Sequence, residues 1–324
     1  MVASLGQAVL KSVREWLTEG QRAWLCTIVQ TWGSSPRPAG SWLAVSESGE
    51  WSGSVSGGCL EEHLLSQCVQ NRPESPQLLD YGVTDTDRGT FQLPCGGRIQ
   101  LYVEPLFPDK SRAHIEALLA ALDARQPVAR RIDMASANAE LVVGERCQAP
   151  ARLVVSEGVL EHCLTPACRL LLVGAGEVAR YVAAFAEAAG FDVSLCEPRE
   201  AFSAGWTGER PLISALPDDL VVQQFSDRWS GVLALAHDPR VDDMALLAAL
   251  RSEAFYVGAM GSVKTSSARR ERLASLGLTD SELDRLHAPI GVNIPSKTPA
   301  EIAIAIVADL IKARWDMLAS LPDL

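Results

Sequence analysis

The fold of the second half of this chain is decided by the stretch Arg169-Leu170-Leu171-Leu172-Val173-Gly174-Ala175-Gly176-Glu177-Val178-Ala179. Its first five residues are mostly apolar and have the character of a buried strand. The two glycines then open a helix, which stops at Gly190. A strand, a glycine-rich turn and a helix in this order begin a Rossmann-type unit, because such a turn lets the backbone approach a pyrophosphate closely. We therefore predict a dinucleotide fingerprint at Gly174, Gly176 and Ala179.

The carboxylate that this fingerprint needs stands at the tip of the next predicted strand. Phe191 to Cys196 is that strand, and Glu197 follows it. A carboxylate here binds a ribose hydroxyl and repels a 2′-phosphate, which favours an NAD-like over an NADP-like ligand. Arg199, two residues later, makes this preference modest. Whether a dinucleotide binds is a separate question from the fold, because folds outlive their ligands. If one binds, the fingerprint favours an NAD-like dinucleotide.

Strands and helices continue to alternate after this point. Val232 to Ala236 and Ala254 to Val257 have strand character, and the helical segment Asp242 to Leu250 separates them. This alternation predicts a parallel, doubly wound sheet, whose ligands bind at the carboxyl ends of the strands. That edge would collect Gly174, His237-Asp238-Pro239 and the segment Gly258-Ala259-Met260-Gly261-Ser262.

The residues of this predicted edge have more than one interpretation. His237 would act as a general base or ligand, or it would be a structural residue that caps the next helix together with Asp238. Gly261 and Ser262 would contribute to the ligand crevice. Lys264, Arg269 and Arg270 follow on the next helix and predict a local basic patch in an otherwise acidic protein.

Length and composition indicate two domains. A chain of 324 residues exceeds the size at which one hydrophobic core stops growing, and its 48% apolar residues can fill two cores. Thr165-Pro166 interrupts the pattern, and the segment from Val128 to Cys163 before it alternates like sheet. We expect an α/β protein with a mixed α+β domain over residues 1–165 and a Rossmann-like parallel sheet over residues 166–324.

The formal charge of -11 argues against a nucleic-acid or membrane-surface binder. No run of about 20 apolar residues occurs, and Met1 to Leu10 lacks the basic and apolar segments of a signal peptide. The eight cysteines are scattered over both halves without the framework of a small secreted domain. These features predict a cytoplasmic protein.

Two cysteines of the first half are flanked by glycines, in Ser56-Gly57-Gly58-Cys59 and Cys95-Gly96-Gly97. Cys59 falls in the first turn of a predicted helix, where Gly57 and Gly58 would form an anion cradle. One interpretation is a thiolate of lowered pKa that binds a soft metal or accepts sulfur, and the other is a small buried packing residue. Cys95 precedes a strand and has no helix dipole to activate it.

A third loop, Gly33-Ser34-Ser35-Pro36-Arg37-Pro38-Ala39-Gly40, adds an arginine to these cysteine loops. The flanking prolines fix an extended backbone that presents the Arg37 guanidinium to a phosphate or carboxylate. A surface salt bridge is the alternative for Arg37. If the three loops converge, they form a place for a reactive sulfur and an anion.

In combination, these motifs resemble the XdhC/CoxI family, the maturation factors of xanthine dehydrogenase and related molybdenum hydroxylases. The resemblance covers nearly the whole chain. Its matching segments are 33–40, 53–61, Cys95-Gly96-Gly97 ahead of Val103-Glu104-Pro105-Leu106, the glycine turn of the second half, 237–239, 258–262, Ala288-Pro289-Ile290-Gly291 and Thr298-Pro299-Ala300-Glu301-Ile302. The chain departs from the family at Glu197, where an aspartate is common, and at Pro94, where a glycine is usual.

The resemblance implies a cofactor-insertion chaperone rather than a catalyst. Such a protein binds the molybdenum cofactor while a cysteine desulfurase installs its sulfido ligand, and then delivers it to a xanthine dehydrogenase-type enzyme. Cys59 would contact molybdenum or relay sulfur, with Cys95 as the second thiol, and Arg37 or the glycine amides would hold the phosphate. A homodimer is also expected, because a transfer protein presents its site to large partners.

Two alternatives to this function remain open. An NAD-dependent oxidoreductase would have the same Rossmann architecture, but no Tyr-x-x-x-Lys pair occurs and the cysteine loops go unexplained. A non-catalytic scaffold would only bridge desulfurase and dehydrogenase without retaining the cofactor.

Overall fold

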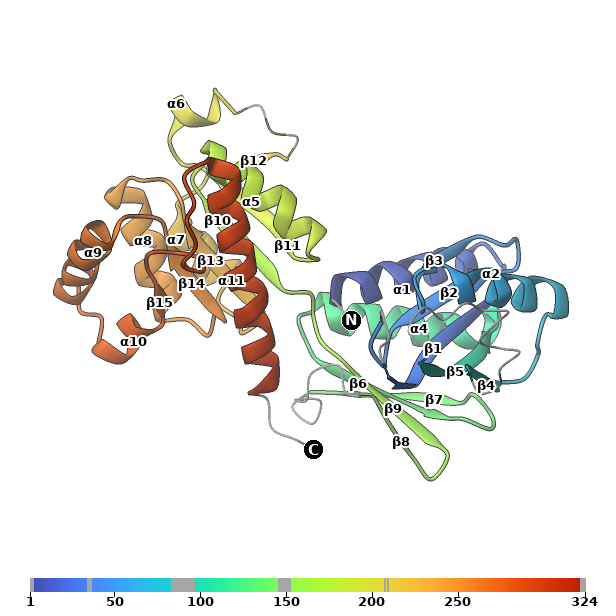
Figure 1. The fold of residues 1–324 in the computed structure, drawn as a ribbon. Coiled ribbons are helices and arrows are strands. Elements are labelled where there is room, and N and C mark those ends of the chain that lie inside the picture. The colour runs from blue at the N-terminus through green and yellow to red at the C-terminus, as the bar shows by residue number, and fades with distance from the viewer. Residues whose placement is uncertain are drawn as a thin grey trace. The chain divides into compact units, whose positions relative to one another are not determined.

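The computed structural model describes residues 3–33, 37–82, 97–144, 153–206, 208 and 210–320 (Figure 1). The chain forms two compact units. Unit 1 contains the residues up to Pro166, and unit 2 is Ala167–Ser320. Each unit has hydrophobic clusters of its own, so each is described by itself. Cys95, Pro94 and Gly96 lie outside the described residues.

Unit 1 is built on an antiparallel sheet with the strand order β3-β2-β1-β5-β4. Its strands are β1 (Ala23–Trp32), β2 (Trp42–Ser46), β3 (Trp51–Gly53), β4 (Gln77–Tyr81) and β5 (Arg98–Leu106). Side chains of β1 alternate between two apolar clusters, one with Leu25 and the other with Trp24 and Cys26. The first cluster contains helices α1 (Ala3–Thr18) and α4 (Pro108–Asp123), and the second contains α2 (Cys59–Ser66) and the π-helix η1 (Gln67–Asn71).

A second antiparallel sheet of unit 1 has the strand order β7-β6-β9-β8. Its strands are β6 (Val128–Asp133), β7 (Ala139–Val143), β8 (Leu153–Ser156) and β9 (Val159–Leu164). Val29 of β1 and Tyr102 of β5 pack against Ile132 and Leu160 of this sheet. The sequence therefore predicted sheet correctly over the segment that ends at Cys163.

Unit 2 is a parallel sheet with the strand order β12-β11-β10-β13-β14-β15. Numbered along the unit, this is the order 3-2-1-4-5-6 of dinucleotide-binding folds, so the predicted Rossmann-like class is confirmed. Its strands are β10 (Arg169–Val173), β11 (Asp192–Cys196), β12 (Leu212–Ile213), β13 (Ser230–Ala234), β14 (Tyr256–Ala259) and β15 (Leu286–His287).

Helices cover both faces of this sheet (Figure 1). Helices α5 (Glu177–Ala188) and α11 (Pro299–Ala319) share one apolar cluster with β10, β11 and β14. Helices α7 (Pro217–Gln224), α8 (Pro239–Leu250), α9 (Val263–Ser275) and α10 (Asp280–Asp284) belong to the cluster on the other face. The short α6 (Glu200–Ser203) follows β11. Within the described ranges, every helix is too short or too polar to cross a bilayer.

Candidate functional site

The glycine turn after β10 has a different requirement at each position of its fingerprint. Gly174 has φ +109°, and a Cβ built on it would lie 2.5 Å from the Cα of Ala236, so only glycine fits there. Gly176 is the N-cap of α5 at an ordinary φ of -85°, and no described atom lies within 4 Å of a Cβ built on it. Ala179 is fully buried in the helix–sheet core. The turn is tight at Gly174 and open at Gly176.

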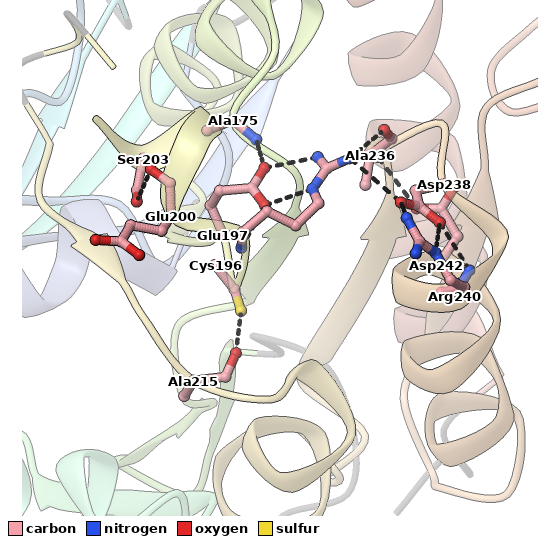
Figure 2. A network of polar contacts seen from close by, with 11 residues as sticks. Ala175, Cys196, Glu197, Glu200, Ser203, Ala215, Ala236, Asp238, Arg240 and Asp242 are labelled. Carbon is pink, nitrogen blue, oxygen red and sulfur yellow. Dashed lines mark hydrogen bonds and ion pairs between the residues drawn. The ribbon is translucent and has the colours of Figure 1, made fainter. Parts of the chain in front are cut away.

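Glu197, at the tip of β11, is fully buried and already bound within the chain (Figure 2). The Ala175 N–H donates to Oε2 at 3.0 Å, and Arg199 donates from Nε to Oε1 and from Nη2 to Oε2, both at 2.8 Å. Burial alone would raise the pKa of Glu197, but the hydrogen bonds from Arg199 and Ala175 lower it. Both oxygens therefore have partners within the chain. The predicted contact of this carboxylate with a ribose hydroxyl stays a prediction.

Arg199 bridges the ends of β11 and β13, because it contacts Glu197 after β11 and the segment from Ala236 to Asp238 after β13. Its guanidinium is 3.9 Å from the centre of the Phe202 ring, and Nη1 donates to the Ala236 carbonyl at 3.4 Å. The carboxylate of Asp238 is 3.8 Å from the same nitrogen. The hydrogen bond with Glu197 raises the pKa of Arg199 above its ordinary value. The guanidinium therefore lies beside Glu197, the residue that the fingerprint assigns to a ribose hydroxyl.

His237 and Asp238 have separate roles at the end of β13. Asp238 caps α8, because its Oδ1 accepts the Arg240 N–H at 3.0 Å, and hydrogen bonds from Arg240 lower the pKa of Asp238 to about 2. His237 is exposed, has a left-handed backbone with φ +55°, and makes no hydrogen bond to the described residues. It does not share the cap, and its direct role stays a prediction.

Gly261 and Ser262 precede α9. The Ser262 hydroxyl accepts the Thr265 N–H at 3.1 Å and so caps this helix. A Cβ built on Gly261 would lie 3.2 Å from the Cβ of Thr265. The side chain of Ser262 thus has a structural use, and its predicted contact with a cofactor is untested.

The predicted basic patch on α9 is wrong for two of its three residues. Arg269 is 2% exposed and donates to the Met260 carbonyl at 3.0 Å and to Asp242 at 3.2 Å. Arg270 donates to the carbonyls of Leu283 and Leu286, at 2.6 and 2.7 Å. These guanidinium groups join elements of unit 2, and only Lys264 is an exposed cation.

In unit 1, the loop between β3 and α2 is organised by Glu61. This carboxylate is 6% exposed. Its Oε1 accepts from the Ser54 hydroxyl at 2.7 Å and from the backbone N–H groups of Val55, Ser56 and Gly57 at 2.9, 2.8 and 3.1 Å. Its Oε2 accepts from the Ser56 hydroxyl and from the Gly58 N–H. Burial would raise the pKa of Glu61, but these bonds outweigh it and lower the pKa to about 2.

The anion cradle predicted at Gly57 and Gly58 therefore already holds an anion from the same chain. Both glycines have positive φ, +86° and +145°, which turns their N–H groups toward Glu61. The helix begins at Cys59, so the predicted first-turn position is confirmed. The Cys59 side chain itself is outside what the structure describes.

Two of the three predicted loops meet. Trp32 of β1 pairs with Arg98 of β5, and a Cβ built on Gly33 would lie 3.4 Å from the Cα of Gly97. Arg37, which follows Gly33 by four residues, is half-buried. For the loop with Gly57 and Gly58, no described atom lies within 4 Å of a Cβ built on either glycine.

Sequence reasoning missed the parts played by Glu61 and Arg199, although each has a signal. Glu61 stands three residues after the N-cap Gly58, the position from which a glutamate commonly reaches back to the cap. Arg199 is two residues from Glu197 in an extended segment, a spacing that puts both side chains on one side. For metals, no group of three His, Cys, Asp or Glu side chains gathers in the described parts of the chain; the proposed metal contact of Cys59 is untested.

Comparison with known proteins gives matches along most of the chain. A family model described as the XdhC Rossmann domain matches residues 170–310, and one described as the XdhC and CoxI family matches residues 16–82. The molybdenum cofactor insertion chaperone PaoD of Escherichia coli is 27% identical over 309 residues, which cover 95% of this chain and 88% of that protein. A probable xanthine dehydrogenase subunit of Bacillus subtilis is 28% identical, over 92% and 95% of the two chains.

A solved structure agrees with these sequence matches. A protein from Bacillus halodurans, described as a xanthine dehydrogenase, superposes with a TM-score of 0.76 at 25% identity. The superposition covers 97% of this chain and 98% of that one.

Proposed function

Because this chain belongs to the XdhC and CoxI family, we propose that it binds the molybdenum cofactor as cargo and delivers it to a xanthine dehydrogenase-type enzyme. The names of the Escherichia coli and Bacillus subtilis relatives, which match over most of their lengths, support this role. Sulfuration of the cofactor while it is bound, with sulfur from a cysteine desulfurase, is the finer part of the proposal. A homodimer and a cytoplasmic location belong to the proposal as well.

The observation that carries the proposal is the open start of α5. Every helix has N–H groups without intrahelical acceptors in its first turn, and among the described residues no side chain caps those of α5 at Gly176. A phosphate fits such a turn, because the N–H groups and the helix dipole both favour an anion. The molybdenum cofactor is a pterin that carries a phosphate. We place this phosphate at Gly174–Glu177 of unit 2, since the amides of Gly57 and Gly58 bind Glu61.

Within unit 1 the proposal concerns sulfur, and this part is independent of the phosphate position in unit 2. The proposed sulfur groups are the thiols of Cys59, at the start of α2, and of Cys95. A thiolate can bind molybdenum and can also take part in sulfur transfer. Arg37 is proposed as a further contact to an anionic part of the cargo. Glu61 binds the backbone N–H groups of Gly57 and Gly58 directly before Cys59, which would fix where the thiol is presented.

The Glu197–Arg199 pair weighs against the alternative of an NAD-dependent oxidoreductase. Adenosine binding to this fold uses the acidic residue at the tip of the second strand, and here Arg199 occupies it. We therefore propose that the cargo uses the phosphate part of the Rossmann edge without its ribose part. A scaffold that never retains a cofactor differs from this proposal in one measurable property, the molybdopterin that co-purifies with the chain.

The retention of molybdopterin is tested by placing a negative charge in the glycine turn before α5. Gly176→Asp would put a carboxylate at the proposed phosphate position, and its backbone and surroundings accept a side chain. Gly205→Asp is the matched control, because Gly205 is exposed, lies in the same unit and has an ordinary φ. We expect the molybdopterin retained per chain, measured as its fluorescent oxidation product, to fall about tenfold in Gly176→Asp only. Equal retention in both variants would contradict the proposed site.

The sulfur part is tested separately with Cys59→Ala. Retained molybdopterin should stay near the wild-type amount, while the fraction of client enzyme that receives sulfurated cofactor should fall. Serine at residue 59 gives a hydroxyl of similar size as the control for packing. If Cys59→Ala delivers sulfurated cofactor as well as the wild type does, this thiol has no part in the transfer.

A further inference from the structure

Unit 1 contains a cavity of about 330 Å³ that the proposed function does not use. It lies between the start of α4, strand β6 and the turn from β6 to β7. Its volume is at the lower end of the range for small-molecule sites. Its polar lining residues are Glu74, Lys110, Ser111, His114, Arg130, Ser136 and Asn138.

One wall of the cavity is a buried group of fixed geometry. Arg130 is 1% exposed, and its Nη1 and Nη2 donate to the two Glu104 oxygens at 2.6 and 2.9 Å. Its Nε donates to Nε2 of His114 at 3.0 Å. A guanidinium has only donors, so Nε2 of His114 must be the acceptor, and a neutral ring then carries its proton on Nδ1. The charges of Arg130 and Glu104 balance, and the histidine is held in one tautomer.

The donors that remain are suited to an anion. Burial and the neighbouring Arg130 lower the pKa of His114 to about 4, so at neutral pH the ring is a neutral donor. In the described parts of the chain, no acceptor binds this Nδ1 and no carboxylate pairs with Lys110. The Lys110 ammonium lies 5.7 Å from the centre of the Phe107 ring. The Ser111 hydroxyl accepts the Phe107 N–H at 3.1 Å, which leaves its own proton to donate.

Glu74 is the carboxylate among the described lining residues of the cavity. Glu74 is paired with Arg22 at 3.3 Å, so its charge opposes an anion less than a lone carboxylate would. The cavity also adjoins the first turn of α4, a helix of 16 residues whose dipole adds positive potential at this end.

We propose that this cavity binds a small oxyanion, a carboxylate or a phosphate, through the Lys110 ammonium and the neutral donors of His114 and Ser111. The site is independent of the proposed cofactor role, because it uses different residues. Carboxylate and phosphate share the oxygen chemistry that these donors recognise, and the two are separated by experiment.

The test is isothermal titration of the full chain with succinate and, separately, with inorganic phosphate, at constant ionic strength with chloride as the blank. We expect saturable binding of one of these anions, and the anion that binds decides the class. Lys110→Gln should weaken this binding about tenfold, which corresponds to about 1.4 kcal/mol. Lys11→Gln removes the same charge from an exposed position on α1 and should leave the affinity unchanged.

Two results would overturn the proposal. One is the absence of saturable binding for both anions in the wild type. The other is equal binding by Lys110→Gln and Lys11→Gln, which would make the attraction a property of the whole chain. Because Lys110 is exposed, its replacement should leave the thermal unfolding curve unchanged, and this curve is the check on folding.

Discussion

Both glycine-rich turns of this protein precede a helix, but their backbone N–H groups have different partners. In unit 1, Gly57-Gly58 precedes α2, and in unit 2, Gly174-Ala175-Gly176 precedes α5. A buried glutamate faces each turn. Glu61 comes from the helix that follows its turn and binds the N–H groups from Val55 to Gly58. Glu197 comes from a neighbouring strand and binds the single N–H of Ala175 in its turn.

This difference decides which turn is available to an anionic ligand. A helix N-terminus attracts anions through its N–H groups, and an internal carboxylate that binds them removes most of that attraction. The turn of unit 1 is filled by its own glutamate and is therefore a structural device that fixes the backbone around Cys59. In the turn of unit 2, no described side chain caps the start of α5, and Glu197 is paired with Arg199.

The largest expected effect comes from removing the Glu61 carboxylate from the turn of unit 1. Glu61→Ala leaves the backbone N–H groups of Val55, Ser56 and Gly58 without an acceptor, and we expect the free energy of unfolding to fall by about 4 kcal/mol. Urea denaturation at neutral pH measures it. Glu62→Ala is the matched control, since Glu62 is the exposed neighbour in the same turn, and it should cost less than about 0.5 kcal/mol. A similar small loss in both variants would mean that the turn holds its shape without the carboxylate.

Acid should weaken the same turn in a defined range. The pKa of Glu61 falls from 4.5 to about 2 on folding. Its contribution is therefore complete above pH of about 5 and is lost as the pH falls toward 2, with a size of about 3 kcal/mol. Glu61→Gln has no such titration, so the stability difference between it and the wild type should close across this range. A difference that stays constant from pH 6 to pH 2, measured in urea, would show that Glu61 does not titrate in this way.

The two glycines of the turn in unit 2 should respond differently to alanine. Gly174→Ala forces a Cβ to within 2.5 Å of the Ala236 backbone at a φ of +109°, and we expect a loss of about 3 kcal/mol. Gly176→Ala meets open space and should cost less than about 1 kcal/mol. Thermal unfolding of the two variants measures the contrast. If both variants lose the same free energy of unfolding, the close backbone approach in this turn does not occur at Gly174.

The fold of unit 2 could be predicted because its signals are local. The apolar run from Arg169 to Val173, the glycines after it and the alternation that follows each specify one element, and the strand order then follows from the fold class. Boundaries moved by about two residues, as at β13, because backbone pairing and not composition sets where a strand ends. The antiparallel sheets of unit 1 depend on long-range pairing, so the sequence indicated strands there without their order.

The site was less predictable, because its decisive contacts join residues through side chains. The sequence indicated Glu197 and Arg199 as separate groups, whereas their pairing fixes what each can bind. It likewise indicated Arg269 and Arg270 as surface cations, although tertiary contacts bury the first and use both for bonds within unit 2. Charge in a sequence predicts charge on a surface only where no partner is folded against it.

The smallest expected effect tests the ribose position of unit 2. Arg199→Ala removes the bidentate partner of Glu197, while the N–H groups of Ala175 and of residue 199 remain as donors to it. We therefore expect a loss of about 2 kcal/mol, less than for a buried carboxylate left with no partner. The freed oxygens should also accept ribose hydroxyls, so the affinity for NADH, measured by its fluorescence, should rise about tenfold over the wild type. Arg240→Ala is the control, because it removes an exposed arginine that pairs with Asp238 on the same edge. If NADH binds the wild type and Arg199→Ala with the same affinity, the guanidinium does not block the ribose position, and the oxidoreductase alternative regains its main support.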